Sequence, residues 1–270
     1  MTSCAETGLA YDRAGPRGST PVLLLHAGVA DRRMWEPQWP AVTEEYDAIR
    51  VDLRGFGESV ARPEPALDPV ADVAGTLAAL GADRVHVVGC SFGAGVAAEL
   101  AVAHPGLVAS LLLVTPGGSL IPEATEELRS FARAENAAME VGDLDAAVQA
   151  NLDWWVDGPH RGADAARAEV REQVAAMQRR AFELTDDWDD VEEAELDPPV
   201  LERLGEIAVP TLVLSGALDI DAIDLAARTV AEGIAGARHL TWPDVAHLPS
   251  LERPEEFAEL LLGWLAAQQG

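Results

Sequence analysis

The chain has 270 residues, enough for one large α/β domain with a sizeable core, and a globular composition. Its formal net charge of −27 disfavours nucleic acid and anionic membranes as partners, because their phosphates would be repelled. The two cysteines, Cys4 in an expected N-terminal tail and Cys90, give no disulfide framework. No signal peptide and no apolar run of membrane-spanning length is apparent, so we predict a cytoplasmic protein.

Short apolar runs alternate with helical patterns, as expected for a parallel sheet with crossover helices. The predicted strands are Val22–Leu25, Ala48–Asp52, Val85–Val88, Leu111–Val114 and Thr211–Leu214. Asp68 and Pro69 are typical of a helix start and Gly81 of its end. A last helix is predicted from Pro254. The fold class is therefore α/β, with a mostly parallel central sheet flanked by helices.

The alternation of strands and helices stops between residues 119 and 208, where several helices but no strand are expected. An insertion of this size between two strands predicts a helical cap over the active edge of the sheet. The predicted division is therefore a core domain of residues 1–118 and 209–270 and a cap of residues 119–208.

The cap segment carries three tryptophans, Trp154, Trp155 and Trp188, and an acidic stretch from Asp186 to Asp197. The tryptophans are predicted to bind substrate from above the nucleophile. The alternative is that they form only the core of the cap itself. The acidic stretch is interpreted as a solvated face.

Residues Gly89-Cys90-Ser91-Phe92-Gly93 form a G-x-S-x-G motif between an apolar strand and a predicted helix. Such a turn holds the serine in a strained conformation, and the two glycines leave room for the close approach of strand and helix. It brings the Ser91 hydroxyl to the carboxyl end of the sheet. It also leaves the Phe92 N–H at a helix start, where it can bind an anion. Ser91 is therefore the predicted nucleophile.

A serine nucleophile needs a base, and the order expected for this fold is Ser, then Asp or Glu, then His. Four histidines follow Ser91. His104 ends the helix after the motif, His160 lies in the predicted cap, and His239 enters an apolar run that is expected to be a strand. His247 lies in the loop after that strand, where a base is required, and is the predicted base.

The acid that orients the base is predicted to be Asp219, the first carboxylate after the strand Thr211–Leu214. Asp221 and Asp224 follow it and are the alternatives, although either can cap the next helix.

Acyl transfer also requires two N–H donors for the oxyanion. One is Phe92, and the second is expected in the loop after the first core strand, at Gly28, with Val29 as the alternative and as a substrate contact. His26 precedes the nucleophile and is expected to hold this loop by hydrogen bonds to the backbone. No His or Cys spacing resembles a metal site, and no phosphate-binding loop is present, so neither metal nor cofactor is predicted.

Taken together, these motifs make the chain resemble the α/β-hydrolase family, in particular its capped, single-domain enol-lactone hydrolases and small serine esterases. The matching segments are Leu24–Gly28, Asp52–Ser59, Gly89–Gly93, Gly216–Asp219 and His247–Pro254. The resemblance implies a Ser91–His247–Asp219 triad and an oxyanion hole formed by the Gly28 and Phe92 amides. Ala27 and Ala94 depart from the family, whose members often carry glycine at these positions.

The predicted function is that of a cofactor-free serine hydrolase that cleaves a small, fairly apolar ester or lactone through an acyl-enzyme intermediate. One alternative is a carbon–carbon bond hydrolase or a secondary-metabolism enzyme with the same triad. Another is a binding protein on the hydrolase fold that turns its ligand over slowly or not at all. The sequence leaves the oligomeric state open, with a homodimer among the alternatives.

Overall fold

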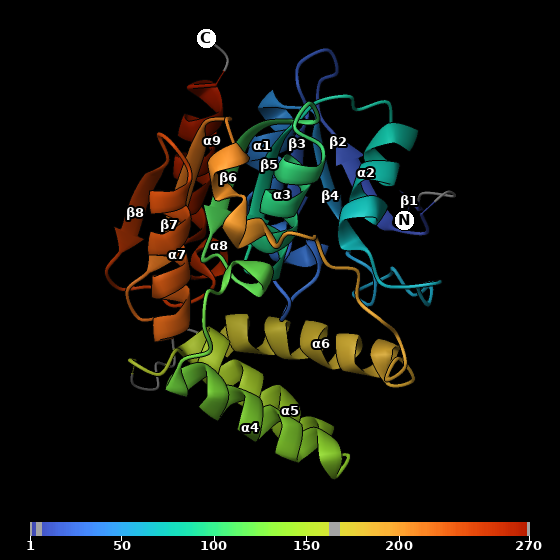
Figure 1. The fold of residues 1–270 in the computed structure, drawn as a ribbon, viewed down its shortest axis with the longest axis vertical. Helices are drawn as coiled ribbons and strands as arrows, with labels where there is room; N and C mark the ends of the chain where they lie inside the picture. Colours follow the sequence, from blue (N-terminus) through green and yellow to red (C-terminus); the bar gives the residue numbers. More distant parts are fainter. Residues whose placement is uncertain (1, 4–6, 162–167, 269–270) are drawn as a thin grey trace.

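The structure is a computed structural model that describes residues 2–3, 7–161 and 168–268, so Cys4 lies outside the described residues. Its strands are β1 Thr2–Ser3, β2 Ala10–Ala14, β3 Val22–Leu25, β4 Ala48–Val51, β5 Val85–Cys90, β6 Val108–Val114, β7 Thr211–Gly216 and β8 Arg238–Trp242. Within the described residues they form one eight-stranded sheet in the order β1-β2-β4-β3-β5-β6-β7-β8 (Figure 1). The strands from β3 to β8 are parallel, whereas β1 and β2 are antiparallel.

All five predicted strands are present, as is the strand expected around His239 (β8), and the structure adds β1 and β2 at the opposite edge of the sheet. The sequence did not predict β2, whose residues Ala-Tyr-Asp-Arg-Ala contain no continuous apolar run. This strand pairs with β4 through its backbone, and its side chains are mostly half-buried. A half-buried strand next to the short edge strand β1 lacks the apolar signature of the buried central strands.

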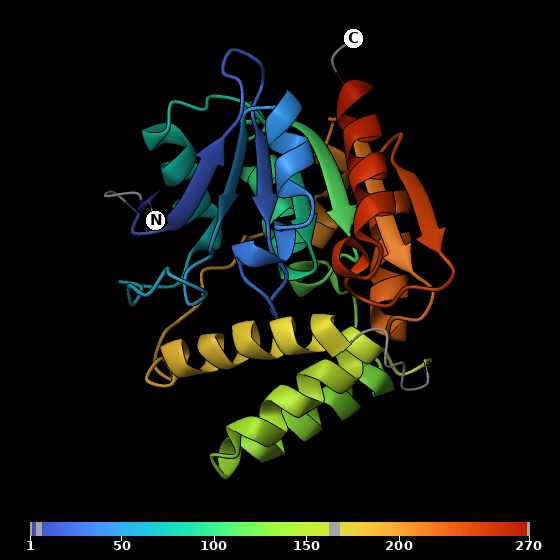
Figure 2. The ribbon, with the colours of Figure 1, turned by 180° about the vertical axis from the view of Figure 1, so that it is seen from behind.

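Helices cover both faces of the sheet. They are α1 Trp39–Glu45, α2 Pro69–Ala79, α3 Phe92–Ala103, α7 Asp221–Gly233, α8 Pro249–Glu252 and α9 Pro254–Ala266, with short 3₁₀ turns at Arg32–Trp35, Gly118–Leu120, Val200–Glu202 and Leu204–Glu206. Helices α2, α3 and α7 lie on the face seen in Figure 1, and α1 and α9 lie on the opposite face, seen in Figure 2. Two apolar clusters fill the space between the sheet and these layers.

Helix α2 begins as the sequence predicts. The Asp68 carboxylate accepts a hydrogen bond from the Ala71 N–H, and Pro69 occupies the first turn. Such a cap satisfies one of the free N–H groups at a helix start. Helix α9 likewise begins at Pro254, and it buries Phe257, Leu261 and Leu265 against the sheet.

A further layer lies beyond the carboxyl ends of the parallel strands (Figures 1 and 2). It consists of α4 Glu126–Glu140, α5 Leu144–Asn151, a π-helical turn Leu152–Asp157 and α6 Ala168–Thr185. In the described residues between β6 and β7, the only β-type pairing is an isolated bridge between Leu67 and Glu193. The chain thus inserts a helical cap between two strands of the core.

No helix in the described part of the chain has both the length and the apolar character needed to cross a membrane.

Candidate active site

Ser91 lies in the turn between β5 and α3 with φ +53° and ψ −115°. A positive φ is uncommon for a residue with a side chain, and such strain is concentrated at functional sites. The two glycines of the motif are required by space. A Cβ atom on Gly89 would lie 2.2 Å from the Gly93 carbonyl oxygen, and one on Gly93 would lie 2.5 Å from the His26 carbonyl oxygen. The sequence Gly-Cys-Ser-Phe-Gly therefore folds into the sharp turn expected for the motif.

The residue before Ser91 is a cysteine whose side chain is fully buried. Burial raises the pKa of the Cys90 thiol to about 12. A thiol is nucleophilic only as its thiolate. Cys90 is therefore a packing residue at neutral pH, and Ser91 is the exposed member of the pair, with a half-buried side chain.

Asp219 and His247 are brought into direct contact by the loops after β7 and β8. The Nδ1 atom of His247 lies 2.7 Å from Oδ2 of Asp219, and both side chains are buried. The other oxygen, Oδ1 of Asp219, accepts a hydrogen bond from the Ile220 N–H, which fixes the carboxylate. A carboxylate at Nδ1 favours the tautomer with its proton on that nitrogen, so that Nε2 of the neutral ring carries the lone pair.

The Thr115 side chain ties the His247 loop to Cys90, the residue before Ser91. The Thr115 hydroxyl, directly after β6, donates a hydrogen bond of 2.9 Å to the carbonyl oxygen of His247. Thr115 has φ +41° and is fully buried, and its Oγ1 atom lies 3.5 Å from the Cys90 sulfur. Within the described residues no hydrogen bond joins the Ser91 hydroxyl to the His247 ring. Such catalytic contacts are often long before substrate binds.

The loop after β3 lies against the start of α3. A Cβ atom on Gly28 would be 3.5 Å from the Cβ of Phe92, and the Gly93 N–H donates to the His26 carbonyl oxygen at 3.1 Å. In the described part of the chain, neither the Gly28 N–H nor the Phe92 N–H has a hydrogen-bond acceptor. Val29 is buried in the apolar core. Two backbone donors without acceptors among the described residues therefore belong to residues that pack against each other, and one of them, Phe92, directly follows Ser91.

His26 holds this loop in place. Its Nδ1 lies 2.8 Å from the Ala27 carbonyl oxygen, and its Nε2 accepts a hydrogen bond of 2.9 Å from the Leu53 N–H. A ring that donates at Nδ1 and accepts at Nε2 is neutral, and complete burial lowers the pKa of His26 accordingly. Both ring nitrogens of His26 are thus engaged by backbone groups.

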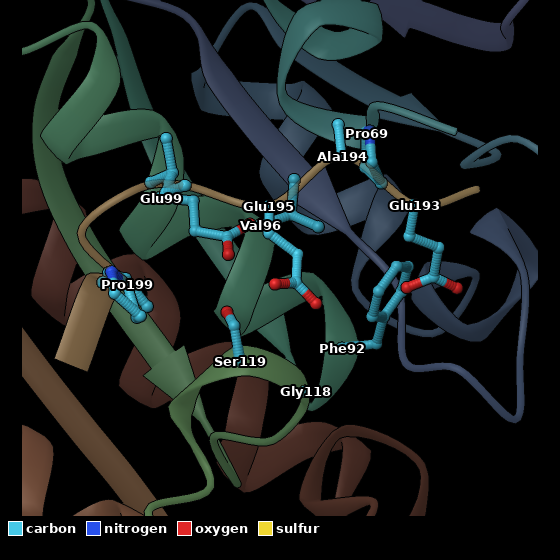
Figure 3. A pocket seen from close by; sticks show the side chains of 12 residues that line it. Pro69, Phe92, Val96, Glu99, Gly118, Ser119, Glu193, Ala194, Glu195 and Pro199 are labelled. Carbon is cyan, nitrogen blue, oxygen red and sulfur yellow. The ribbon is translucent and has the colours of Figure 1, made fainter. Parts of the chain in front are cut away.

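A pocket of about 460 Å³ opens beside these donors and is lined by both core and cap. Gly28, Phe56 and Phe92 form its core side, and Trp188 and Thr185 come from the end of the cap. A second pocket of about 570 Å³ shares Phe92 and Glu193 with it. Figure 3 shows this second pocket, with the carboxylates of Glu99, Glu193 and Glu195 around the space beside Phe92.

The three cap tryptophans occupy three different environments. Trp188 lines the pocket beside Gly28, whereas Trp154 is partly buried against the apolar core. Trp155 is buried, and its ring centroid lies 4.5 Å from that of His247. On its other side it meets Phe131 of α4 at 5.0 Å. Trp155 therefore connects the cap to the imidazole itself.

A family model described as the alpha/beta hydrolase family matches residues 22–260 of this chain. The chain belongs to the alpha/beta hydrolase family. It is 25% identical to 3-oxoadipate enol-lactonase 1 of Acinetobacter baylyi, over 94% of this chain and 92% of that protein. The solved structure of Est816, an N-acyl homoserine lactone degrading enzyme, superposes with a TM-score of 0.71 at 26% identity, covering 94% and 96% of the two chains.

The enol-lactonase from Burkholderia xenovorans LB400 superposes with a TM-score of 0.75 at 22% identity, over 96% of each chain, which shows a shared fold. The predicted fold class and the resemblance to esterases and lactonases are thereby confirmed. The protein is a hydrolase, as predicted.

Several residues around the site of this hydrolase were not singled out in the sequence. Thr115 follows β6 and so lies at the same sheet edge as Ser91 and Asp219, a signal that was available from the predicted strands. Glu252 and Arg161 approach the His247 loop from α8 and from the cap. No local pattern marks these two, because their contacts join segments far apart in sequence.

Proposed function

We propose that this hydrolase cleaves a small, uncharged, apolar ester or lactone through an acyl-enzyme on Ser91. The observation that carries the proposal is the buried contact of 2.7 Å between His247 Nδ1 and Asp219 Oδ2, in a loop tied to the strained serine turn. This is the arrangement by which a base is oriented towards a serine nucleophile.

In the proposed reaction the Ser91 oxygen attacks the substrate carbonyl carbon while His247 Nε2 takes the hydroxyl proton. The Gly28 and Phe92 N–H groups stabilise the oxyanion. Collapse of the tetrahedral intermediate breaks the bond to the leaving oxygen, which receives the proton from His247. Water then attacks the acyl-enzyme with His247 again as base, the bond to the Ser91 oxygen breaks, and that oxygen receives the proton from His247. Asp219 stabilises the imidazolium in both steps. The products are a carboxylic acid and an alcohol, or one hydroxy or keto acid from a lactone.

The lining of the pocket beside Gly28 supports an apolar substrate. Phe56, Phe92 and Trp188 supply aromatic surface, and Asp189 and Glu193 add negative charge at its edge. The Arg54 guanidinium, which also lines this pocket, is engaged by the Asp72 carboxylate. An anionic substrate would therefore meet uncompensated like charge. The lactone-acting relatives support a lactone as one member of the substrate class.

The proposed acyl-enzyme predicts a burst of 4-nitrophenol when the enzyme is mixed with excess 4-nitrophenyl acetate, provided that deacylation is the slower step. The burst amplitude is expected to equal the concentration of active enzyme. Prior treatment with a serine-directed phosphonylating reagent should abolish both the burst and the steady-state turnover of the ester. A binding protein that does not turn over its ligand would give neither, and a reagent-insensitive steady state would contradict the proposal.

The different environments of the cap tryptophans predict different effects on substrate preference. Trp188→Leu should change the relative kcat/KM across a series of acetyl, butyryl and hexanoyl esters by about tenfold, since it reshapes the pocket wall. Trp154→Leu is the matched control, because that ring packs against the apolar core. It should lower the unfolding temperature while preserving the preference profile. An unchanged profile in Trp188→Leu would remove this residue from the substrate pocket.

A further inference from the structure

We propose that Arg161 and Glu252 are positioning residues for His247, through which the cap sets the geometry of the catalytic base. The proposal rests on the proposed function, because it takes His247 as the base. Neither residue lines the pockets described above.

Glu252 of α8 holds the backbone on both sides of His247. Its Oε1 atom accepts hydrogen bonds from the Ala246 N–H at 2.9 Å and from the Leu248 N–H at 3.4 Å. The side chain is only 3% exposed, so these bonds are shielded from water. Together with the Thr115 hydroxyl on the His247 carbonyl oxygen, they fix three consecutive residues of the loop. The backbone that carries the His247 imidazole is thereby held in place.

Arg161 connects this carboxylate to the cap segment. Its Nη2 atom lies 2.6 Å from the second oxygen of Glu252 and donates a hydrogen bond of 2.7 Å to the Asp244 carbonyl oxygen. Burial raises the pKa of Glu252, and the Arg161 charge opposes that rise. A carboxylate accepts stronger hydrogen bonds than a neutral carboxyl group. The Arg161 charge therefore favours the carboxylate form of Glu252, which best holds the His247 loop.

The same segment touches the acid and base loops at two more points. The Trp155 ring packs on the His247 ring, as described above. Gly158, with φ +78°, packs so closely that a Cβ atom would lie 2.4 Å from the Leu218 carbonyl oxygen and 2.9 Å from the Ala246 Cβ. Leu218 and Ala246 precede Asp219 and His247 directly. The chain from Trp155 to Arg161 thus follows the pair His247–Asp219 on its cap side.

The test compares the steady-state kinetics of Arg161 and Glu252 variants on 4-nitrophenyl acetate. Only the turnover that the phosphonylating reagent abolishes is counted. Arg161→Met is expected to lower kcat about tenfold with KM changed by less than about twofold, because small misplacements of a base cost rate rather than binding. Arg161→Lys should recover most of that loss. Glu252→Gln should resemble Arg161→Met, and the double variant should be no slower than either single variant, because both act through one contact.

Arg179→Met is the matched control, since Arg179 forms an ion pair with Asp145 between two cap helices, away from the His247 loop. It should leave kcat unchanged. Two results would overturn the proposal: an unchanged kcat in Arg161→Met with a lowered unfolding temperature, or a raised KM with unchanged kcat. The first would mean a purely structural ion pair and the second a substrate contact.

A substrate-free measurement separates this proposal from the proposed function. The proton between His247 Nδ1 and Asp219 is expected to give a low-field proton resonance that Asp219→Asn removes. This resonance should shift or broaden in Arg161→Met and stay in place in Arg179→Met. It does not depend on acylation of Ser91, so it remains informative if no ester is turned over. An identical resonance in Arg161→Met and the unmodified protein would contradict positioning by the cap.

Discussion

Replacing Ser91 with alanine is expected to abolish ester hydrolysis and to leave the fold intact. Loss of a nucleophilic serine from a triad lowers kcat by a factor of about 10⁶ in a well-studied protease. In the described part of this structure the Ser91 hydroxyl forms no hydrogen bond, so its removal breaks none. The measurement is kcat on 4-nitrophenyl acetate together with thermal unfolding followed by circular dichroism.

The matched control is Ser215→Ala, which removes a buried hydroxyl from β7 that contacts side chains of β8. The Ser215 hydroxyl contacts His239 Nε2 at 2.8 Å. This variant should lose some stability and keep most of its turnover, the opposite of Ser91→Ala. Turnover near that of the unmodified enzyme in purified Ser91→Ala would exclude Ser91 as the nucleophile.

The second large effect is expected from the His247–Asp219 pair. His247→Ala should be nearly as damaging as Ser91→Ala, because the hydroxyl proton then has no acceptor. Asp219→Asn should lower kcat by a factor of about 10⁴, as the corresponding change does in a serine protease, since an amide favours the wrong tautomer of the ring. Both variants are measured on the same ester, with folding checked by circular dichroism.

His239→Ala and Asp221→Asn are the controls for this pair. His239 lies in β8, where its ring contacts Ser215, and Asp221 lies at the start of α7. Each is expected to keep kcat within about threefold, as residues outside a catalytic unit do. Comparable losses in Asp221→Asn and Asp219→Asn would require another carboxylate as the acid, and a greater loss in His239→Ala would move the base to the preceding strand.

Much of the fold could be predicted because its core strands are buried on both faces. Runs such as Val22–Leu25 are continuously apolar, and such runs are typical of central parallel strands. The serine turn was recognisable for a second reason. Gly89 and Gly93 have no room for a Cβ atom, so the sequence must carry glycine at both positions. Strand β2 could not be recognised, since backbone pairing leaves little trace in a half-buried, charged pentapeptide.

The cap was predictable as a helical insertion, but the places of its side chains were not. Trp154 and Trp155 are neighbours in sequence, yet Trp154 is only partly buried against the apolar core, whereas Trp155 is buried in it and lies on the His247 ring. The π-helical turn that carries them changes the direction of successive side chains, and such turns have no simple periodicity. The Arg161–Glu252 ion pair joins residues 91 positions apart and depends on how the cap rests on the core.

The most direct test of the proposed chemistry is to trap the acyl-enzyme. The enzyme is mixed with excess 4-nitrophenyl acetate, quenched in acid during the burst, digested and mapped by mass spectrometry. The proposal predicts one acetyl group per active enzyme, on the peptide that contains Ser91, and none on that peptide in Ser91→Ala. Full hydrolytic turnover with the acetyl group on another residue, or a burst with no acetyl group on the Ser91 peptide, would contradict an acyl-enzyme on Ser91.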